Sequence, residues 1–109
     1  MTRGEIWTAT DDVEYAGKPR PVVIIQHDQF EIMDSVTICG FTRDPTDLPL
    51  FRIRIEPTTL NGLEFTSRIM VDKILTIRKS KLGYQIGRLG DRDMGRLDQA
   101  IAIFLGLTN

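Results

Sequence analysis

Residues 18–28, with the sequence KPRPVVIIQHD, constrain the fold of this chain more than any other stretch. Residues 22–25 are four branched apolar residues in a row, a pattern that predicts a central strand with both faces covered. Arg20 stands just before this run, between Pro19 and Pro21. Because a proline pushes the residue before it into an extended conformation, the backbone of Arg20 is restricted before any tertiary contact forms. The arginine is then either a cation held in place at the N-terminal end of a buried strand or an ordinary solvated residue at a strand end.

A chain of 109 residues with 41% hydrophobic and 27% charged residues is expected to fold as one soluble domain, residues 1–109, around a single core. No apolar run approaches the roughly 20 residues that span a bilayer, and the polar N-terminus does not resemble a signal peptide. A cytoplasmic location without membrane contact is therefore expected. The one cysteine excludes an internal disulfide.

The net charge of −1 predicts no general affinity for nucleic acids, but the charges are unevenly distributed along the chain. Residues 52–96 hold ten of the 14 basic residues, whereas acidic residues cluster at 11–14, 44–47 and 91–98. Two interpretations are open: a local basic face that binds phosphates, or a solvated surface of mixed sign.

Short alternations of apolar and polar residues predict a β-rich fold. Strands are expected at residues 3–9, 32–41, 50–56 and 84–89, and residues 67–77 read as a bent strand or as two strands joined by a bulge. Residues 10–19 read as a loop and residues 78–83 as one helical turn. A C-terminal helix is expected to begin with Asp91 as N-cap and to end at Gly106, with an apolar stripe packed on the sheet. That stripe consists of Met94, Leu97, Ile101, Phe104 and Leu105.

Several kinds of chemistry are excluded by what the sequence lacks. It has neither a Walker A motif nor a GxGxxG motif. One histidine and one cysteine are too few for a zinc site or for a pair of catalytic histidines. Cys39 lies in an apolar strand and is expected to be a buried small residue. His27 is expected at the surface or at the rim of a site, and no metal site is predicted.

The residues that remain for chemistry are Arg20, Thr42, Ser67 and Glu14, all at strand ends or in loops. An arginine, hydroxyls and a carboxylate suit phosphoryl chemistry on a substrate that carries its own nucleophile. RNA is such a substrate, because its 2′-hydroxyl can attack the adjacent phosphate. A fixed guanidinium would then stabilise the negative charge that develops on the phosphate.

The ordered set of motifs resembles the MazF/PemK/Kid family of toxin endoribonucleases, the mRNA interferases of type II toxin–antitoxin systems. RGEIW at residues 3–7 is similar to the opening of that family, and RPVVIIQHD at 20–28 to its arginine-containing strand. CGFTRD at 39–44 resembles the strand end with the family's threonine. NGL at 61–63, SRIMVDKILTI at 67–77 and the FLGL of the C-terminal helix follow in the family's order.

The resemblance implies an α+β fold that is mainly β: a small SH3-like barrel of curved antiparallel strands with a long C-terminal helix, as in CcdB and Kid. It implies a homodimer that cleaves single-stranded RNA without metal or cofactor and leaves a 2′,3′-cyclic phosphate and a 5′-hydroxyl. The expected partner is an antitoxin whose acidic or partly disordered C-terminal segment lies over the RNA groove.

Residue by residue, the resemblance places the catalytic roles at Arg20 and Thr42 and a possible proton-transfer role at Glu14. The loop before Arg20 departs from the family, with GKPRP where GxRP is common. Some members carry an aspartate where this chain has Ser67, and that aspartate's role in proton transfer would be absent here. The expected RNA-binding residues are Lys18, Arg43, Ser67, Arg68, Lys73, Arg78 and Lys79. Trp7, Tyr15, Phe41 and Phe65 are candidates for stacking on bases.

One alternative comes from another functional class. CcdB-like proteins of the same fold poison DNA gyrase without enzymatic activity, but they depend on a tryptophan near the C-terminus. The C-terminal FLGLTN of this chain has none. A module that has kept the fold and lost its activity is a third interpretation, which the presence of Arg20 and Thr42 disfavours.

Overall fold

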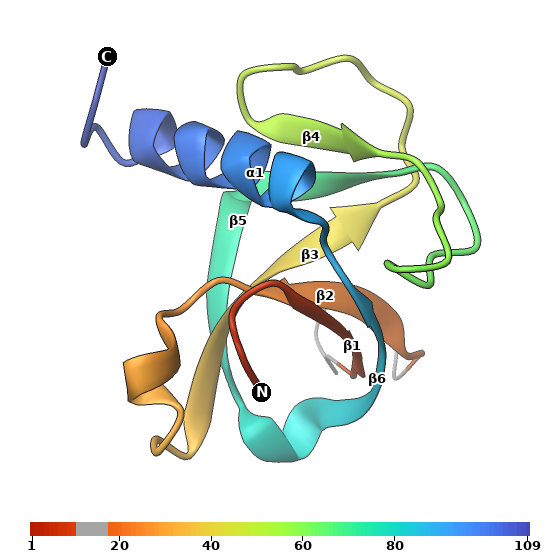
Figure 1. Cartoon of the computed structure of the whole chain (residues 1–109), viewed down its shortest axis with the longest axis vertical. Helices are drawn as coiled ribbons and strands as arrows, with labels where there is room; N and C mark the ends of the chain where they lie inside the picture. Colours follow the sequence, from red (N-terminus) through yellow and green to blue (C-terminus); the bar gives the residue numbers. More distant parts are fainter. Residues whose placement is uncertain (11–17) are drawn as a thin grey trace.

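A computed structural model describes residues 1–10 and 18–109, and these fold into one curved antiparallel sheet and one long helix (Figure 1). The strands are β1 (Glu5–Ala9), β2 (Arg20–Ile24), β3 (Ser35–Thr42), β4 (Arg52–Ile55), β5 (Ser67–Arg78) and β6 (Leu82–Arg88). The helices are α1 (Asp91–Phe104) and two short 3-10 turns, η1 (Asp28–Phe30) and η2 (Lys79–Lys81). Within these described residues, no helix is both long enough and apolar enough to span a bilayer.

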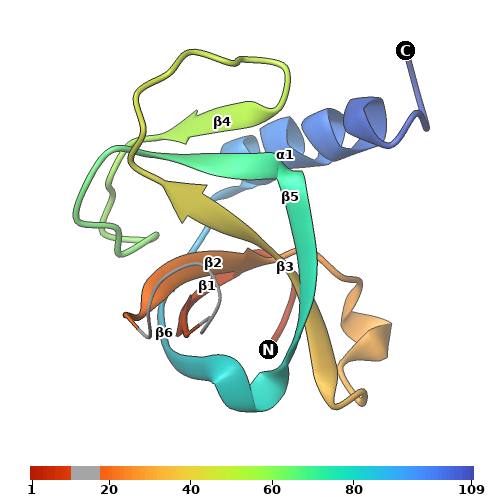
Figure 2. The ribbon, with the colours of Figure 1, turned by 180° about the vertical axis from the view of Figure 1, so that it is seen from behind.

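The sheet has the order β4-β5-β3-β2-β1-β6, and each pair of neighbours is antiparallel. The expectation of a mainly β fold with a C-terminal helix is confirmed. Residues 67–77 belong to one long strand, because β5 pairs with β4 at its beginning and with β3 along most of its length. Its register with β3 shifts between Cys39 and Phe41, and β5 bends sharply in both Figure 1 and Figure 2.

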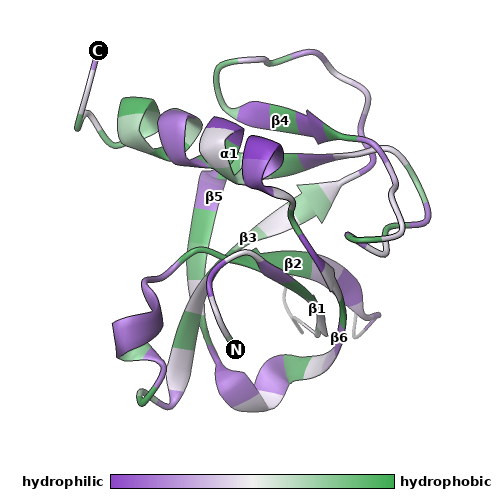
Figure 3. Cartoon of the chain, viewed as in Figure 1, coloured by the Kyte–Doolittle hydropathy of each residue, from purple (hydrophilic) through white to green (hydrophobic). Residues whose placement is uncertain are grey.

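The run of branched residues in β2 is buried on both faces, as its sequence predicts. Val23 belongs to a core beneath α1, whereas Val22 and Ile24 belong to a second core on the opposite face of the strand. This division follows from the strand geometry, because successive side chains point to opposite faces. Figure 3 shows β2 as apolar over most of its length, with a hydrophilic beginning. The first residue of β2 is Arg20.

The two cores differ in what they join. The helix-side core contains side chains of five strands and of α1, and the second core contains side chains of β1, β2 and β3. Buried members of the helix-side core include Ile6, Val23, Cys39, Phe41, Ile53, Ile55, Ile69, Val71, Leu89, Leu97 and Ala100. Buried members of the second core are Ala9, Val22, Ile24, Val36 and Ile38.

Helix α1 corrects two details of the sequence interpretation. The N-cap is Gly90, and Asp91 is the first helical residue, where its carboxylate still lies in the positive first turn. Leu97 and Ala100 are buried, but Phe104 and Leu105 are 46% and 54% exposed. The predicted apolar stripe therefore packs on the sheet only in its first part, because the end of α1 extends beyond β5 (Figures 1 and 2).

The end of the helix has the expected geometry. Gly106 has a φ of 76°, and its N–H donates to the carbonyl of Ile103 at 3.1 Å. The N–H of Leu107 donates to the carbonyl of Ala102 at 2.8 Å. A left-handed glycine with these two bonds is the usual way to satisfy the last carbonyls of a helix.

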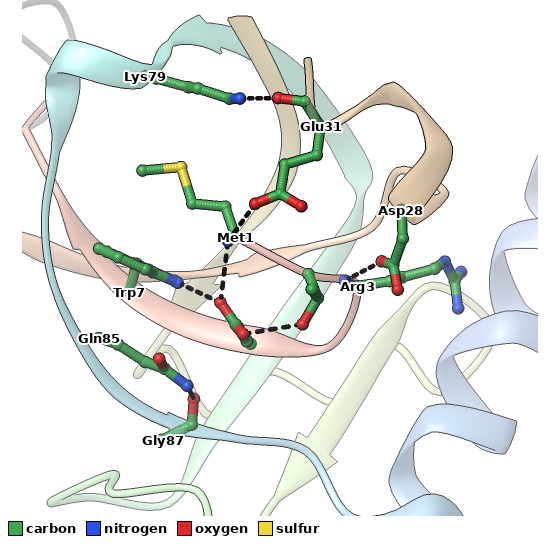
Figure 4. Close-up of polar contacts among 10 residues, drawn as sticks. Met1, Arg3, Trp7, Asp28, Glu31, Lys79, Gln85 and Gly87 are labelled. Carbon is green, nitrogen blue, oxygen red and sulfur yellow. Dashed lines mark hydrogen bonds and ion pairs between the residues drawn. The ribbon is translucent and has the colours of Figure 1, made fainter. Parts of the chain in front are cut away.

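The N-terminal segment is tied to the turn that follows β2 (Figure 4). The ammonium group of Met1 lies 2.9 Å from the carboxylate of Glu31, and this hydrogen bond is the main reason why the pKa of the amino group is raised. The backbone N–H of Arg3 donates to Asp28 at 2.7 Å, and the Arg3 side chain pairs with Asp98 of α1 at 2.6 Å. These contacts hold the end of the central strand against both the N-terminus and the helix.

Candidate functional site

A groove of about 380 Å³ opens where β2 begins and β3 ends. Four of the predicted site residues line it together: Arg20, Thr42, Arg43 and Ser67. The remaining wall is largely aromatic and aliphatic, and it comes from β1, β3, β6 and the connection between β4 and β5. Those residues include Thr8, Phe41, Leu63, Phe65, Tyr84 and Ile86. A cation and hydroxyls beside aromatic rings are what a single-stranded nucleic acid requires of its binding surface.

Arg20 and Thr42 are brought together by the pairing of β2 with β3. The register pairs Val22 with Gly40 and Val23 with Cys39, and two residues beyond this pairing Arg20 and Thr42 line the same groove. Arg20 is exposed at this strand end and pairs with Ala9 of β1 on its other side. The sequence predicted both the strand and the position of the arginine at its N-terminal end.

The hydroxyl of Thr42 holds the segment that follows β3. Its Oγ1 accepts a hydrogen bond from the backbone N–H of Asp44 at 3.1 Å. A hydroxyl has one donor and two acceptor sites, so the proton of Thr42 is still able to donate to another group. The Asp44 carboxylate accepts from the backbone and the hydroxyl of Thr46 at 3.0 and 2.7 Å, and the hydroxyl bond in particular lowers its pKa. The turn after Thr42 is therefore fixed by its own polar side chains.

Arg43 lies on the face of the Phe65 ring. The central guanidinium carbon is 3.7 Å from the ring centroid, which is stacking distance. The sequence predicted RNA contacts for each of these residues separately. It did not predict that they touch, because the contact joins the end of β3 to the segment before β5.

Ser67 lines the groove but is only 4% exposed. Its hydroxyl donates to the carbonyl of Phe65 at 2.9 Å, which fixes the backbone of that residue. Ser67 therefore shapes the wall of the groove through Phe65.

Asn61 is a residue whose importance sequence reasoning missed, since it read only as part of a turn. The side chain is buried and its amide oxygen accepts from the N–H groups of Thr58 and Leu63, both at 3.0 Å. Its amide nitrogen donates to the carbonyl of Glu56 at 2.9 Å. These three bonds hold the connection between β4 and β5 in the shape that forms one wall of the groove.

Gly62 shows how closely this connection approaches β6. Its φ is 69°, and a Cβ atom at this position would lie 2.0 Å from the carbonyl oxygen of Ile86. A residue with a side chain would be strained in this conformation and would also clash. The Asn-Gly pair at 61–62 is thus needed to bring the connection against β6.

Arg68 lies in a neighbouring basic groove of about 370 Å³, between β4, β5 and α1. Cross-strand pairing places Arg68 opposite Thr42 on one side and opposite Arg54 on the other. Thr42, Arg68 and Arg54 therefore form one cross-strand row that leads from the groove of Arg20 and Thr42 into the basic groove. Its arginines are Arg52, Arg54, Arg68 and Arg96.

The arginines of the basic groove differ in how firmly they are held. Arg52 makes a bidentate contact with the carboxylate of Asp72, with hydrogen bonds of 2.7 and 3.0 Å. Arg54 pairs with Glu56 at 2.7 Å, and Arg96 bonds both Asp93 and the Arg54 carbonyl at 2.9 Å.

The other predicted RNA-binding residues are distributed over the molecule. Lys18 is exposed two positions before Arg20. Lys73 lines an apolar hollow on β5, with Val22 and Ile38. Arg78 and Lys79 line a third hollow at the far end of β5, where the Lys79 ammonium donates to the Glu31 carbonyl. Neither Lys73 nor these two residues line the groove of Arg20 and Thr42. Glu14 and Tyr15 fall in residues 11–17, outside the described residues.

Cys39 and His27 lie where the sequence predicts them. Cys39 is fully buried, and burial raises the pKa of its thiol to about 12, so it is protonated at neutral pH. His27 is exposed, and its Nδ1 accepts from the N–H of Gln29 at 3.1 Å at the start of η1.

Comparison with known proteins identifies relatives over nearly the whole chain. Residues 2–105 match the family described as the PemK-like, MazF-like toxins of type II toxin–antitoxin systems. The chain is 50% identical over 107 residues, 98% of each chain, to a probable endoribonuclease MazF of Mycolicibacterium smegmatis. The Mycobacterium tuberculosis toxin MazF-mt6 superposes with a TM-score of 0.81 at 27% identity, covering 96% of this chain and 99% of that one. A mycobacterial endoribonuclease solved with its cognate antitoxin superposes with a TM-score of 0.84 at 23% identity, covering 100% and 98%, and shares the fold.

Proposed function

Because the chain belongs to the PemK-like, MazF-like toxins of type II toxin–antitoxin systems, we propose that it is an endoribonuclease that cleaves single-stranded RNA at selected sequences. The observation that carries this proposal is the meeting of Arg20 and Thr42 in one groove with an aromatic wall. The 50% identical relative is named as a probable endoribonuclease, which supports the same activity. The net charge of −1 is no obstacle, because four arginines line the basic groove next to that of Arg20 and Thr42.

In the proposed reaction the 2′-oxygen of one nucleotide attacks the phosphorus that links it to the next. The new P–O2′ bond forms as the P–O5′ bond breaks, which leaves a 2′,3′-cyclic phosphate and a 5′-hydroxyl. The 2′-hydroxyl loses a proton, and the departing 5′-oxygen gains one. The nucleophile belongs to the substrate, so this route uses no cofactor.

The proposed roles of Arg20 and Thr42 follow from the charge of the reacting phosphate. Negative charge increases on the phosphate oxygens in the transition state, and a guanidinium at the strand end stabilises it. Arg20 takes this role, and the hydroxyl of Thr42 donates a hydrogen bond to the same phosphate. Glu14 is proposed as a proton carrier on the strength of the family resemblance.

The RNA strand is proposed to continue from the groove of Arg20 and Thr42 into the basic groove. Arg68 is the nearest cation in that direction, since it pairs with Thr42 across β3 and β5. Its position suits a phosphate next to the cleaved one. Lys18, two residues before β2 begins, suits the phosphate on the opposite side of the cleaved one.

The proposed partner is an antitoxin that covers the groove when the toxin is inactive. One structural relative is a mycobacterial endoribonuclease in complex with its cognate antitoxin. An acidic segment that is disordered alone and folds on contact would compete with RNA for the same arginines. The active form is proposed to be a homodimer that works in the cytoplasm, where its RNA substrate is found.

The test is cleavage of a defined single-stranded RNA by purified Arg20→Ala. We expect the rate to fall by roughly a hundredfold to a thousandfold, the usual cost of removing one preorganised donor from a charged transition state. Arg20→Lys should retain part of the rate, because lysine keeps the positive charge. It should not restore the full rate, because lysine cannot donate in the bidentate geometry of a guanidinium. The products should carry 5′-hydroxyl ends, detected by direct labelling with polynucleotide kinase.

Arg92→Ala is the matched control, because Arg92 is exposed on α1 and lines none of the grooves described above. It should cleave at the wild-type rate. Wild-type cleavage by Arg20→Ala would show that Arg20 is not the catalytic cation. If the wild-type chain cleaves no RNA and traps gyrase on DNA instead, the nuclease proposal is wrong as a whole.

A further inference from the structure

The stacked pair of Arg43 and Phe65 is the feature of the groove that phosphate chemistry does not explain. Arg43 directly follows Thr42, yet its guanidinium lies over the Phe65 ring at 3.7 Å. Phe65 is a large apolar side chain that is 48% exposed, and both residues line the groove. An aromatic ring half open to solvent, with a cation on its face, forms a flat surface of the kind on which bases stack.

The backbone on both sides of this pair is held by hydrogen bonds. The bond from Asp44 N–H to Thr42 Oγ1, at 3.1 Å, spans Arg43. The bond from the Ser67 hydroxyl to the Phe65 carbonyl, at 2.9 Å, anchors Phe65. The pair is therefore set in place before any ligand arrives, which lowers the entropy that binding would cost.

Stacking also restricts the directions in which Arg43 can donate. The N–H groups of a guanidinium lie in its plane, and contact with the face of the Phe65 ring restricts how that plane can turn. Donors in a fixed plane match the flat edge of a base better than they match a phosphate. In the proposed site the cleaved phosphate already has Arg20 and Thr42 as its partners. A guanidinium has no acceptor, so an exocyclic amino group on a base would meet donor against donor.

We infer that Arg43, held by Phe65, is the residue that reads a base beside the cleaved phosphate and selects keto bases over amino bases. Guanine presents O6 and N7 as acceptors on its Hoogsteen edge and uracil presents O4. Adenine and cytosine present an amino group at the corresponding position. This inference rests on the proposed function, and it names the specificity determinant of that site.

The experiment compares single-site RNA oligonucleotides that differ in one flanking base. For the wild-type chain we expect RNA with guanine at one flanking position to be cleaved roughly tenfold or more faster than RNA with adenine or cytosine, the usual range for one bidentate base contact. Uracil, which offers the single acceptor O4, should be preferred over adenine and cytosine by a smaller factor. Arg43→Ala should remove this preference. Phe65→Leu should also remove it, because leucine keeps a large apolar side chain but lacks the ring that orients the guanidinium.

Two further variants separate base reading from charge. Arg43→Lys keeps the charge without the planar fork, so it should lose the preference while retaining more of the rate than Arg43→Ala. Arg92→Ala removes one positive charge outside the grooves and should keep both the preference and the rate. Each variant is checked for folding by circular dichroism and thermal unfolding before it is assayed.

A phosphate contact would give a different result. If Arg43 held a phosphate, Arg43→Ala would slow all sequences equally and make cleavage less sensitive to salt, and the inference would be overturned. It would also be overturned if the wild-type chain showed no keto preference at any flanking position. Binding of 2′-O-methyl RNA, which this route cannot cleave, gives the same base comparison without catalysis. A chain that cleaves nothing thus refutes the proposed function, whereas the role of Arg43 is decided separately by binding.

Discussion

At the scale of single residues, Thr42 carries two separable hydrogen bonds. Its oxygen accepts from the Asp44 N–H, and its proton is placed to donate to the phosphate in the proposed reaction. Thr42→Val keeps the branched shape and removes both bonds, so we expect the cleavage rate to fall by roughly a hundredfold. Thr42→Ser keeps the hydroxyl and should stay within a few-fold of the wild-type rate. The measurement is single-turnover cleavage of a defined RNA.

Thr76→Val is the control for this prediction. Thr76 is an exposed residue of β5 whose hydroxyl bonds that of Thr37 at 2.7 Å, and it does not line the groove. The substitution removes a hydroxyl from a strand surface in the same way and should leave cleavage unchanged. Equal rates for Thr42→Ser and Thr42→Val would show that the hydroxyl of Thr42 does not determine the cleavage rate.

At the scale of elements, the edge strand β4 depends on the ion pair between Arg52 and Asp72. The two side chains are 13% and 22% exposed, and their hydrogen bonds of 2.7 and 3.0 Å lower the pKa of Asp72. A carboxylate with a lowered pKa in the folded state stabilises that state above its unfolded pKa of about 4. The contribution is lost as the pH falls through the folded pKa.

Asp72→Asn should therefore lower the free energy of unfolding by about 1 to 2 kcal/mol at pH 7, and the difference from wild type should shrink below about pH 4. Urea unfolding at a series of pH values measures this directly. Asp34→Asn is the control, because Asp34 is exposed and its side chain has no ion pair within the described parts of the chain. A difference that stays constant between pH 7 and pH 3 would exclude ionic linkage as its origin.

Elements were predictable where a local pattern decides them. The alternation around Ile53 and Ile55 gave β4, and the branched run at residues 22–25 gave the central strand. The end of α1 was less predictable, because helical periodicity continues to Leu105 although the sheet no longer lies beneath it. Periodicity shows which face of a helix is apolar, but only the tertiary structure shows how far the neighbouring element extends.

At the scale of the whole molecule, the candidate site combines residues that are far apart in the sequence. Residue chemistry named Arg20 and Thr42 as candidates and the family resemblance assigned their catalytic roles, and the pairing of β2 with β3 brings them to one groove. No sequence pattern indicated the stacking of Arg43 on Phe65. The basic residues of β5 were grouped by composition alone, but a strand of 12 residues is roughly 40 Å long when extended. Lys73 and Arg78 therefore lie along β5 in other hollows than Ser67.

The two cores are joined by β2, whose alternate side chains belong to different cores. Val23 packs in the helix-side core with Leu97 of α1, and Ile24 packs in the second core, against which Trp7 also lies. Because β1 and β3 also contribute side chains to both cores, damage to one core is transmitted to the other through the backbones of three neighbouring strands. Trp7 is the single tryptophan of the chain, so its fluorescence reports on the second core, whereas far-UV circular dichroism reports on α1.

Leu97→Ala should consequently destabilise both cores by the same amount. Leu97 is fully buried, and such a truncation costs about 2 to 5 kcal/mol because it removes apolar contacts and leaves a cavity. At one fixed protein concentration, the urea transitions followed by Trp7 fluorescence and by circular dichroism should move together to a lower midpoint. Leu107→Ala, at a residue 75% exposed beyond the end of α1, should leave both midpoints unchanged. If the circular dichroism transition moved alone, the helix-side core would unfold separately, and the shared strands β1, β2 and β3 would not couple the two cores.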